Sequence, residues 1–435
     1  MIGILKDRIN VIDVSLLRDI ALWKNIGKNI VSFIISKGVT FFAPLLFLKV
    51  VDLEDYGIVE YSYSSGSVLA LVVSLGFINA YPYFVLKKER RDLRNSFLAY
   101  GVMVGLISIP VCVLSHVGMI PQKVYFIYLF TCIFALQRLF SSKLKTEEKG
   151  HWGVLIDSGY YFILLLVIIA CLLKWTENAL QLLKTGMEIY VFCWCGAYTC
   201  LFFAKKQYPL SKIFSRDLPE IFKYSYKLIF SGLLIFWLTS SSRIYIGWFM
   251  GYEQVGIYSY YFRLAGISII IFNFVYIAFF KRLYLADSRR LDLYYTIIIG
   301  VVLLACLGCI FIIPSISSWL LPGVDLKDTK LYILLSLQMP VWVAISLCEG
   351  LIGRENIVAR FNRGLFIIVG CFPVMLYLVK SSLDLPLYAF LCSIVYAVAF
   401  TFQCILLKRK KIYLKKCFLL SSLLLSLSIG TYIFV

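Results

Sequence analysis

Histidine is almost missing from this chain, since only His116 and His151 occur among its 435 residues. Both lie near the ends of long apolar segments and far apart in sequence, so a histidine pair that holds a metal ion is not expected. The thirteen cysteines fall in or beside apolar segments, and no CxxC pair faces a polar loop. The pattern therefore predicts no zinc site, no disulfide framework and no cofactor.

Acidic residues are also few, with 24 Asp and Glu against 43 Lys and Arg and a formal net charge of +19. Such an excess suggests nucleic acid as a partner, but the basic residues are unevenly distributed. Most of them gather in every second polar segment, namely 6–28, 87–91, 143–149, 205–227, 281–290, 354–363 and 408–416. This is the positive-inside pattern of membrane proteins, with the N-terminus in the cytoplasm. The charge therefore indicates orientation and attraction to anionic membrane lipids, and nucleic acid is not an expected partner.

Long polar segments on the opposite, charge-poor side are missing as well. The longest polar segment on that side covers about residues 315–330 and contains only Asp325 and Asp328 as acidic residues. A membrane-embedded glycosyltransferase or polymerase needs a sizeable outer loop with catalytic Asp, Glu, Arg or His, so the chain is not expected to be an enzyme. A cleavable signal peptide is not predicted either, because the first apolar run is long enough to remain in the membrane.

What the chain does contain is apolar sequence: 61% of its residues are hydrophobic and its mean hydropathy is +0.86. No soluble core absorbs that much apolar surface. We predict thirteen spans, at residues 29–51, 62–86, 95–117, 122–142, 152–174, 186–205, 224–248, 256–280, 293–315, 329–352, 362–380, 385–407 and 417–435. A helix of about 20 residues crosses a hydrocarbon core of about 30 Å, so the sequence predicts an all-α integral membrane protein.

The two halves of the chain are related in sequence. The longest inner link, about 206–223, separates two sets of six predicted spans. An offset of 199 residues places 28–32 on 227–231 and 56–61 on 255–260, and Lys, Ile, Ser, Gly, Ile and Tyr recur at matching positions. We therefore predict two six-helix bundles related by a pseudo-twofold axis along the membrane normal, with a central cleft between them. The predicted units are an N-terminal lobe, 1–205, a C-terminal lobe, 206–410, and an additional transmembrane helix, 411–435, appended to the twelve-helix core.

Lys37 is the most informative single residue, because it lies near the middle of the first predicted span, roughly 10 Å from the inner edge of the hydrocarbon core by helix rise. Its stem reaches about 6 Å, so snorkelling does not easily bring the charge to water. At about 100° per residue, Asn29, Ser36 and Thr40 fall on the same helix face, which we predict to line a watered cavity. A structural ion pair with another helix is the alternative interpretation.

Two arginines of the second half are the other deep cations. Arg263 lies within the eighth predicted span, with Ser259 one turn away on the same face, and Arg243 lies closer to the outer interface. Snorkelling to that interface is the alternative for both. The deepest charges are thus cations, and no equally deep carboxylate is expected. A cleft that they share requires an anion, so the substrate is predicted to carry phosphate or carboxylate.

The other charged residues carry weaker predictions. Arg138, Asp157 and Glu349 lie toward the inner ends of their predicted spans, where an ion pair, a coupling proton and a plain interfacial charge are all compatible with the sequence. The acidic run from Asp52 to Glu60 is expected to be a solvated loop on the outer side.

Three features resemble the oligosaccharide and polysaccharide flippases, of the O-antigen flippase type, in the multidrug/oligosaccharidyl-lipid/polysaccharide exporter superfamily. They are the cation Lys37 on the first helix, the acidic loop that ends at residues 55–58, and the stretch 255–264, in which a Tyr-rich helix start leads into an Arg-Leu pair. The resemblance covers the first twelve spans, and the last span, 417–435, departs from the twelve-helix pattern. It implies that Arg263 faces a central cavity and contacts a lipid head group, with Lys37 in a comparable role.

The resemblance implies a flippase that moves a polyprenyl-diphosphate-linked oligosaccharide from the cytoplasmic to the outer leaflet of a bacterial inner membrane by alternating access. Lys37, Arg243 and Arg263 are then expected to hold the diphosphate, while Tyr260 stacks on a sugar or packs within the protein. Membrane lipids, a polysaccharide polymerase and chain-length machinery are the expected partners. A cation-coupled multidrug exporter of the same superfamily is the main alternative, although cationic drugs are better matched by deep carboxylates than by deep cations.

Overall fold

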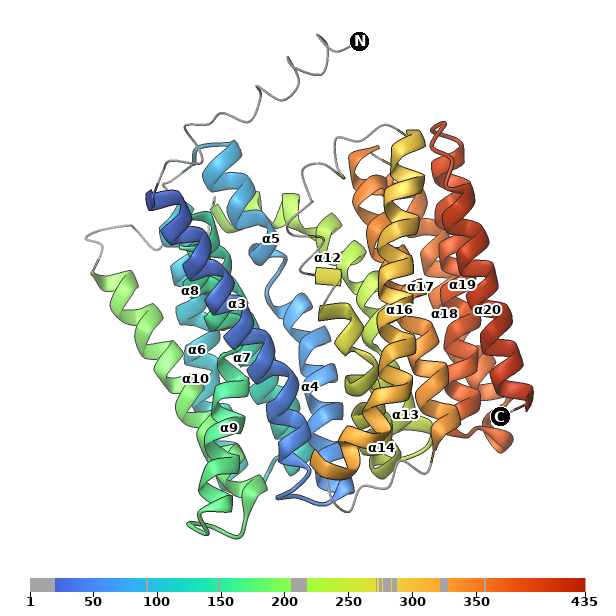
Figure 1. Cartoon of the computed structure of the whole chain (residues 1–435). Helices are drawn as coiled ribbons and strands as arrows, with labels where there is room; N and C mark the ends of the chain where they lie inside the picture. The colour runs from blue at the N-terminus through green and yellow to red at the C-terminus, as the bar shows by residue number, and fades with distance from the viewer. Residues whose placement is uncertain are drawn as a thin grey trace.

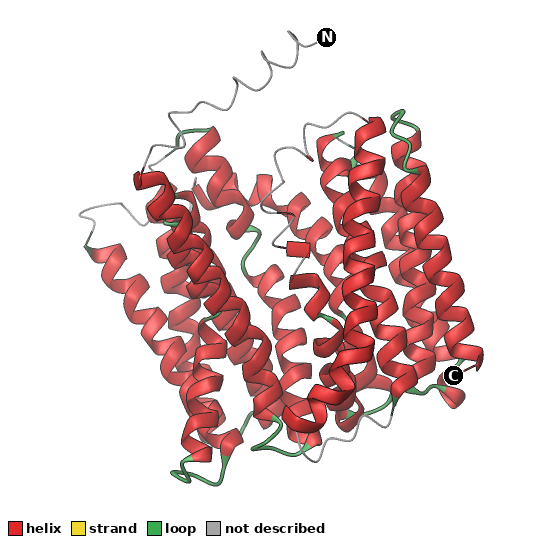
Figure 2. Cartoon of the chain, in the orientation of Figure 1, coloured by secondary structure: helices red, strands yellow, loops and turns green. Residues whose placement is uncertain are grey.

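The structure is a computed structural model that describes residues 20–90, 93–147, 149–204, 217–270, 272–273, 276, 283, 288–320, 328–355 and 357–434. Every regular element within these residues is a helix, as Figure 2 shows. The prediction of an all-α protein is therefore confirmed.

The first half of the chain forms helices that lie together on one side of the molecule (Figure 1). They are α3 (Ile20–Phe47), α4 (Leu53–Val73), α5 (Phe77–Pro82), the π-helix η1 (Tyr83–Lys87), α6 (Arg94–His116), α7 (Gln122–Thr146), α8 (Gly150–Asp157), α9 (Gly159–Leu172) and α10 (Ala179–Phe203).

The second half forms the other side of the molecule (Figure 1). Its described elements are α12 (Leu218–Ser240), α13 (Ser242–Phe249), α14 (Tyr252–Ala265), α16 (Ser288–Leu320), α17 (Thr329–Arg354), α18 (Val358–Leu378), the 3-10 helix η4 (Lys380–Ser382), α19 (Leu385–Lys408) and α20 (Lys415–Phe434).

Nine helices of the described residues are long and apolar enough to cross a membrane, or eleven if each of two bent helix pairs forms one span. Large apolar side chains on their outer faces are exposed, such as Leu304 at 69% and Phe311 at 79%. Because a soluble protein rarely leaves so many large apolar groups uncovered, these faces fit contact with lipid. The chain is therefore a multi-pass membrane protein. The predicted span 256–280 lies partly outside the described residues.

The second predicted span, 62–86, is wrong. The helix α4 begins at Leu53 and ends at Val73, where Leu75 and Gly76 adopt positive φ angles of 48° and 69° and break the helix. Its start is fixed by Asp52, whose side chain accepts a hydrogen bond of 2.8 Å from the backbone N–H of Asp55. Acidic residues in a first turn also interact favourably with the helix dipole. The acidic run therefore opens a helix, and only its first residue, Asp52, lies outside it.

Buried hydrophobic side chains form two separate clusters, one in each half of the chain. The first contains residues from α3 to α10 together with Ile221 of α12, and the second extends from Leu234 to Leu424 and also includes Leu45. Two cores are what the predicted division into two lobes requires, although the boundary at 205/206 itself stays a prediction.

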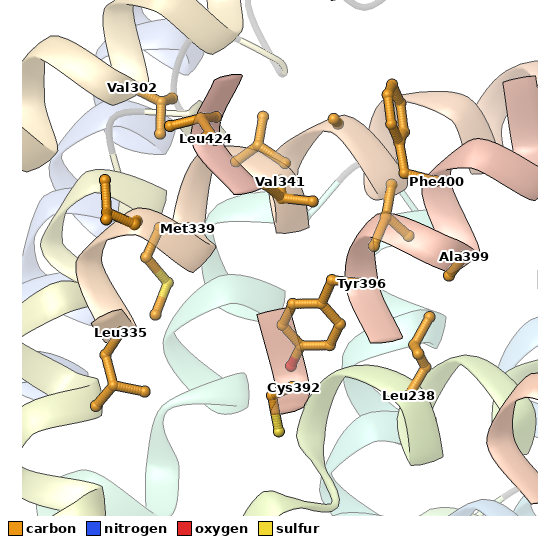
Figure 3. Packing of buried hydrophobic residues seen from close by; sticks show 14 of the residues in the cluster. Leu238, Val302, Leu335, Met339, Val341, Cys392, Tyr396, Ala399, Phe400 and Leu424 are labelled. Atoms are coloured by element: carbon orange, nitrogen blue, oxygen red, sulfur yellow. The ribbon is translucent and has the colours of Figure 1, made fainter. Parts of the chain in front are cut away.

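The C-terminal helix α20 is part of the second core and is not an appendage as the sequence suggested. Leu424 is fully buried and lies near Val302 of α16 and Val341 of α17, in the same cluster as Tyr396 of α19 (Figure 3). In addition, the Asp292 carboxylate of α16 accepts hydrogen bonds of 3.1 and 3.2 Å from the backbone N–H groups of Lys416 and Cys417. These bonds cap the first turn of α20 and fix it against α16.

Leu424→Ala is expected to reduce the free energy of unfolding by about 2–5 kcal/mol, because the substitution leaves a cavity in a packed core. The measurement is the thermal or denaturant midpoint of the purified protein in one detergent. Leu419→Ala, on the same helix with the side chain 74% exposed, is the matched control and is expected to change the midpoint little. Equal losses from both variants would mean that α20 does not belong to the core.

Candidate functional site at the interface of the two halves

The backbones of α4 and α14 approach each other very closely where the two halves meet. A Cβ atom added at Gly57 would lie 1.8 Å from the carbonyl oxygen of Tyr252, and one added at Gly256 would lie 2.4 Å from the carbonyl oxygen of Leu53. Both distances are far below a van der Waals contact, so only glycine allows the helices to lie this close. The contact is at the N-terminal ends of both helices, at the lower end of the molecule in Figure 1.

These two contacts are reciprocal under the sequence offset between the halves. Gly256 follows Gly57 by 199 residues, and Tyr252 follows Leu53 by the same number. Gly57 therefore meets Tyr252, and its equivalent Gly256 meets Leu53, which is the equivalent of Tyr252 in the first half. Such exchange of equivalent residues is what a local twofold axis between α4 and α14 produces.

One helical turn beyond Gly57, the Glu60 carboxylate of α4 binds two arginines of the second half. Its Oε2 atom lies 2.9 Å from Nε of Arg243 in α13, and its Oε1 atom accepts a hydrogen bond from Nη2 of Arg263 in α14. The three side chains are only 4%, 10% and 11% exposed, respectively. The cluster of Glu60, Arg243 and Arg263 thus ties one half of the molecule to the other.

Further polar and aromatic contacts hold Arg243 in place. Its Nε atom donates a hydrogen bond of 2.8 Å to Oγ of Ser259, and its guanidinium carbon lies 5.2 Å from the centre of the Phe262 ring. Two guanidinium groups against one carboxylate leave the cluster with one net positive charge. Since burying an unbalanced charge is costly, this arrangement favours the arrival of further negative charge.

The expectation that no carboxylate lies as deep as the cations is therefore wrong. Glu60 had been placed in a solvated outer loop, but α4 already begins at Leu53, so Glu60 lies about 10 Å along the helix by the rise per residue. The sequence did carry a signal for this helix start. An Asp followed three residues later by another acid is close to a capping box, and a hydropathy window overlooks it.

Lys37 belongs to a different set of contacts, at the bend between α8 and α9. On its helix, the Ser36 hydroxyl is hydrogen-bonded to the Ser158 hydroxyl, and Oγ1 of Thr40 donates to Oγ of Ser158 over 3.3 Å. The two helices on either side of Ser158 are bent by 51°. Lys37 itself is half-buried and interacts electrostatically with Asp157 and Lys145. The side chain of Asn29 lies outside the described residues.

The structure thus brings Arg243 and Arg263 together but places Ser36 and Thr40 within the packing of the first half. Ser259 and Tyr260 are also buried, at 0% and 1% exposed, so in this conformation neither lines an open cavity. Ser259 holds Arg243, whereas Tyr260 packs in the second core beside Tyr261. That Lys37 shares a chamber with the two arginines stays a prediction.

The weaker candidates also have defined surroundings. Arg138 donates a hydrogen bond of 3.3 Å to Oγ of Ser67, and its guanidinium lies over the Phe134 ring at 4.6 Å. Asp157 forms an ion pair with Lys145, which is one of the alternatives that the sequence left open.

Glu349 lines a cavity of about 1040 Å³ between α12, α17 and α18, whose other walls are mainly apolar. Among the remaining lining residues, Ser231 donates a hydrogen bond of 3.3 Å to Oδ1 of Asn362. The cavity belongs to the second half and does not include Arg243 or Arg263.

A second contact between the halves lies where α12 begins. Arg90 forms an ion pair of 3.3 Å with Glu220, Ser96 donates a hydrogen bond of 2.9 Å to Asp217, and the rings of Tyr83 and Tyr224 stack at 4.0 Å. Ile221, on the same turns of α12, is buried in the first core. The helix then bends by 44° and continues in the second half. This bend separates a segment that packs with one half from a segment that packs with the other.

The fold is that of a solved structure described as the outward-facing conformation of a multidrug resistance MATE family transporter of the MOP superfamily, with a TM-score of 0.51 and 15% sequence identity. The alignment covers 94% of this chain and 97% of that one. No curated protein matches the sequence.

A family model described as "Polysaccharide biosynthesis protein" matches residues 22–280, which is more than half of the chain. The chain therefore belongs to this family. The matched region contains Glu60, Arg243 and Arg263 and both glycines of the α4–α14 contact.

Proposed function

We propose that this protein is a flippase that moves a polyprenyl-diphosphate-linked oligosaccharide from the cytoplasmic to the outer leaflet of a bacterial inner membrane by alternating access. The observation that carries the proposal is the buried cluster of two arginines around one carboxylate at the interface of the halves. Membership in a polysaccharide biosynthesis family and the fold of a superfamily transporter support it. The protein acts by binding and conformational change and is not an enzyme.

The diphosphate of the lipid is held by Arg243 and Arg263. Phosphate oxygens accept hydrogen bonds from a planar guanidinium in pairs, and a diphosphate offers more charge and more oxygens than the Glu60 carboxylate does. The head group therefore replaces the carboxylate on the arginines. The lipid tail remains in the bilayer, and Lys37 is expected to meet the head group from the side of the first half.

Exchange of Glu60 for a phosphate links binding to opening. While Glu60 binds both arginines, α4 is fixed to α13 and α14 and the outer ends of the two halves stay closed. Once the diphosphate has taken its place, the carboxylate no longer holds the two halves together, so the outer ends can separate. The bend in α12 between residues 226 and 229 is the natural pivot at the inner side.

The direction of transport follows from the charge pattern. The basic segments, together with the N-terminus, face the cytoplasm, where lipid-linked saccharides are assembled, and anionic lipids are attracted to the same surface. After release at the outer leaflet, the product passes to a polysaccharide polymerase and its chain-length machinery, which are the proposed partners.

Arg263→Gln is expected to weaken head-group binding strongly with little loss of folded protein. The substitution leaves Glu60 and Arg243 as a neutral pair, so no unbalanced charge remains to attract an anion. A charge-assisted contact contributes about 1.5–3 kcal/mol, which corresponds to a loss of affinity of about 10–150-fold. The measurement is pyrophosphate binding by the purified protein, followed by flipping of a fluorescent polyprenyl-diphosphate lipid in vesicles.

Arg354→Gln is the matched control, because Arg354 pairs with the neighbouring Glu355 at the end of α17 and lies outside the cluster. It is expected to bind pyrophosphate as the unchanged protein does. Accumulation of lipid-linked oligosaccharide on the cytoplasmic leaflet of cells that carry only the Arg263→Gln protein provides the cellular readout. Normal surface polysaccharide in those cells would contradict the proposal.

One observation favours a second candidate, the export of hydrophobic cations. Glu349 is a carboxylate in a largely apolar cavity of about 1040 Å³, a setting that suits an amine with an apolar body, and the solved relative is named a multidrug resistance transporter. Export of such compounds would not depend on Arg263. Arg263→Gln therefore separates the two functions, since only the flippase is expected to lose activity.

A further inference from the structure

Three potential metal ligands come together at the end of α6, away from the interface cluster. Cys112 and His116 are one turn apart on α6, and Glu188 faces them from α10. One ligand atom from each lies within 4.8 Å of the others. Within the described residues they are the one group of this kind, and the sequence gave no hint of it because Glu188 is more than seventy positions from His116.

The hydrogen bonds of this group leave two acceptor atoms facing each other. Nδ1 of His116 lies 3.0 Å from the backbone carbonyl oxygen of Cys112, which can only accept, so the ring proton is on Nδ1. The other ring nitrogen, Nε2, faces Oε2 of Glu188 at 3.9 Å. The other carboxylate oxygen, Oε1, accepts a hydrogen bond of 2.9 Å from the Tyr125 hydroxyl. The imidazole nitrogen and the carboxylate oxygen are thus two ligand atoms that face the same gap.

We propose that Cys112, His116 and Glu188 bind a divalent transition-metal ion of the zinc type. Two ligand atoms about 2 Å from one tetrahedral zinc ion lie about 3.3 Å apart, so Nε2 and Oε2, now 3.9 Å apart, need only a small movement of the exposed His116 side chain to bind one ion. The Cys112 Sγ atom lies 3.7 Å from Nδ1 of the same ring, so a rotation of the Cys112 side chain completes the set. Thiolate, imidazole and carboxylate together are ligands that zinc accepts, with a fourth position left to water.

The surroundings suit such an ion in two respects. The Tyr125 hydroxyl orients the carboxylate from behind, as second-shell groups do at metal sites, and the side chain of His116 is 58% exposed and leaves an entry path. Lys184 is the charged group that opposes a cation here, since its Nζ atom lies 5.1 Å from the centre of the Tyr125 ring. A thiolate and a carboxylate outweigh that single charge. Binding releases the thiol proton to water.

A metal ion at this position ties the end of α6 to α10. The two helices are already close along their length, because a Cβ atom at Gly101 would meet the Tyr198 ring at 2.2 Å and one at Gly105 would meet Sγ of Cys195 at 2.6 Å. The ion therefore cross-links α6 and α10 and keeps the first half rigid while the two halves move against each other.

The test uses the full-length protein, purified without a histidine tag and stripped of metal with a chelator. Zinc is expected to bind in one equivalent and to raise the unfolding midpoint, and cobalt is expected to give the near-ultraviolet charge-transfer band of a thiolate ligand. Cys112→Ser should remove the band and the midpoint shift. Cys193→Ser is the matched control, because Cys193 is an exposed cysteine of α10 outside the group.

Two conservative variants keep the result interpretable if Cys112→Ser folds poorly. Tyr125→Phe removes the hydroxyl that bonds the carboxylate and also interacts with the Cys112 thiol, and should weaken zinc binding by about 10–100-fold. Glu188→Gln keeps the size of the side chain and should weaken it further. Zinc binding that is absent, or equal in the Cys112→Ser and Cys193→Ser proteins, would overturn the proposal and leave His116 and Glu188 as an ion pair held by a proton.

Discussion

Replacing Glu60 by Gln is expected to open the contact between α4 and α14. The amide keeps the size of the side chain but removes its charge, so Arg243 and Arg263 remain buried without a counter-ion. Removing one partner of a buried ion pair costs about 3–5 kcal/mol. Because opening lets water reach both guanidinium groups, this cost falls on the closed state alone. The ratio of open to closed protein should therefore rise by roughly 10²–10⁴-fold.

Labelling of a new cysteine measures this opening. Ser64 lies one turn beyond Glu60 on the same face of α4 and is buried, so a Ser64→Cys protein should react with a membrane-impermeant thiol reagent only when the contact opens. The protein without this change gives the background from the natural cysteines. Glu60→Gln is expected to raise labelling strongly and to strengthen pyrophosphate binding, since it increases the charge of the cluster by one unit.

Two further variants separate the effect of the cluster's net charge from the effect of the ion pairs that Glu60 forms between the halves. The double variant Glu60→Gln, Arg263→Gln restores the single net positive charge but still lacks the carboxylate, so it should stay open while binding pyrophosphate less tightly than Glu60→Gln. Asp157→Asn breaks a partly exposed ion pair with Lys145, which contributes about 0–1 kcal/mol, and should leave labelling unchanged. Equal labelling of the Glu60→Gln and Asp157→Asn proteins would show that the cluster does not hold the halves together.

The course of the helices could be predicted from the sequence because their apolar length is a local property. The spans predicted at 122–142 and 385–407 agree closely with α7 and α19. The prediction failed at α4, where Glu60 and several serines make the helix too polar for a hydropathy window. These residues are polar because α4 lies between the two halves and pairs with charges there, and it is not surrounded by lipid. A functional interface is thus the part of a membrane protein that hydropathy describes least well.

The candidate site shows the same limit. Arg243 and Arg263 were identified because a cation within an apolar segment needs a partner, and this reasoning requires only the segment itself. Their partner could not be identified, because Glu60 and Arg263 are 203 residues apart and only the tertiary fold brings them together. The contact at Gly57 and Gly256 could be predicted in part. The offset of 199 residues aligned Gly57 with Gly256, but only the structure shows that the two helices meet at these positions.

Gly57→Val is expected to prevent closure of the same contact by a steric effect. The first atom of the new side chain would lie 1.8 Å from the carbonyl oxygen of Tyr252, which belongs to a helix backbone and cannot rotate away. Overpacking of this kind costs about 1–3 kcal/mol or more in a fixed structure, and here the two halves can avoid the cost by staying apart. The protein should therefore remain open on the outer side, with high labelling at Ser64→Cys and no net flipping of lipid supplied from the cytoplasm.

Gly300→Val is the matched control, since Gly300 lies within α16 and a Cβ atom there meets nothing within 4 Å. Gly256→Val adds a test of the symmetry, because its new side chain would meet the Leu53 carbonyl oxygen at 2.4 Å. If α4 and α14 are related by a local twofold axis, both interface variants should raise labelling, whereas Gly300→Val should not. Glycines that act only through helix flexibility would give similar results at all three positions. Unlike the effect of Glu60→Gln, that of Gly57→Val should be insensitive to salt, because it depends on volume and not on charge.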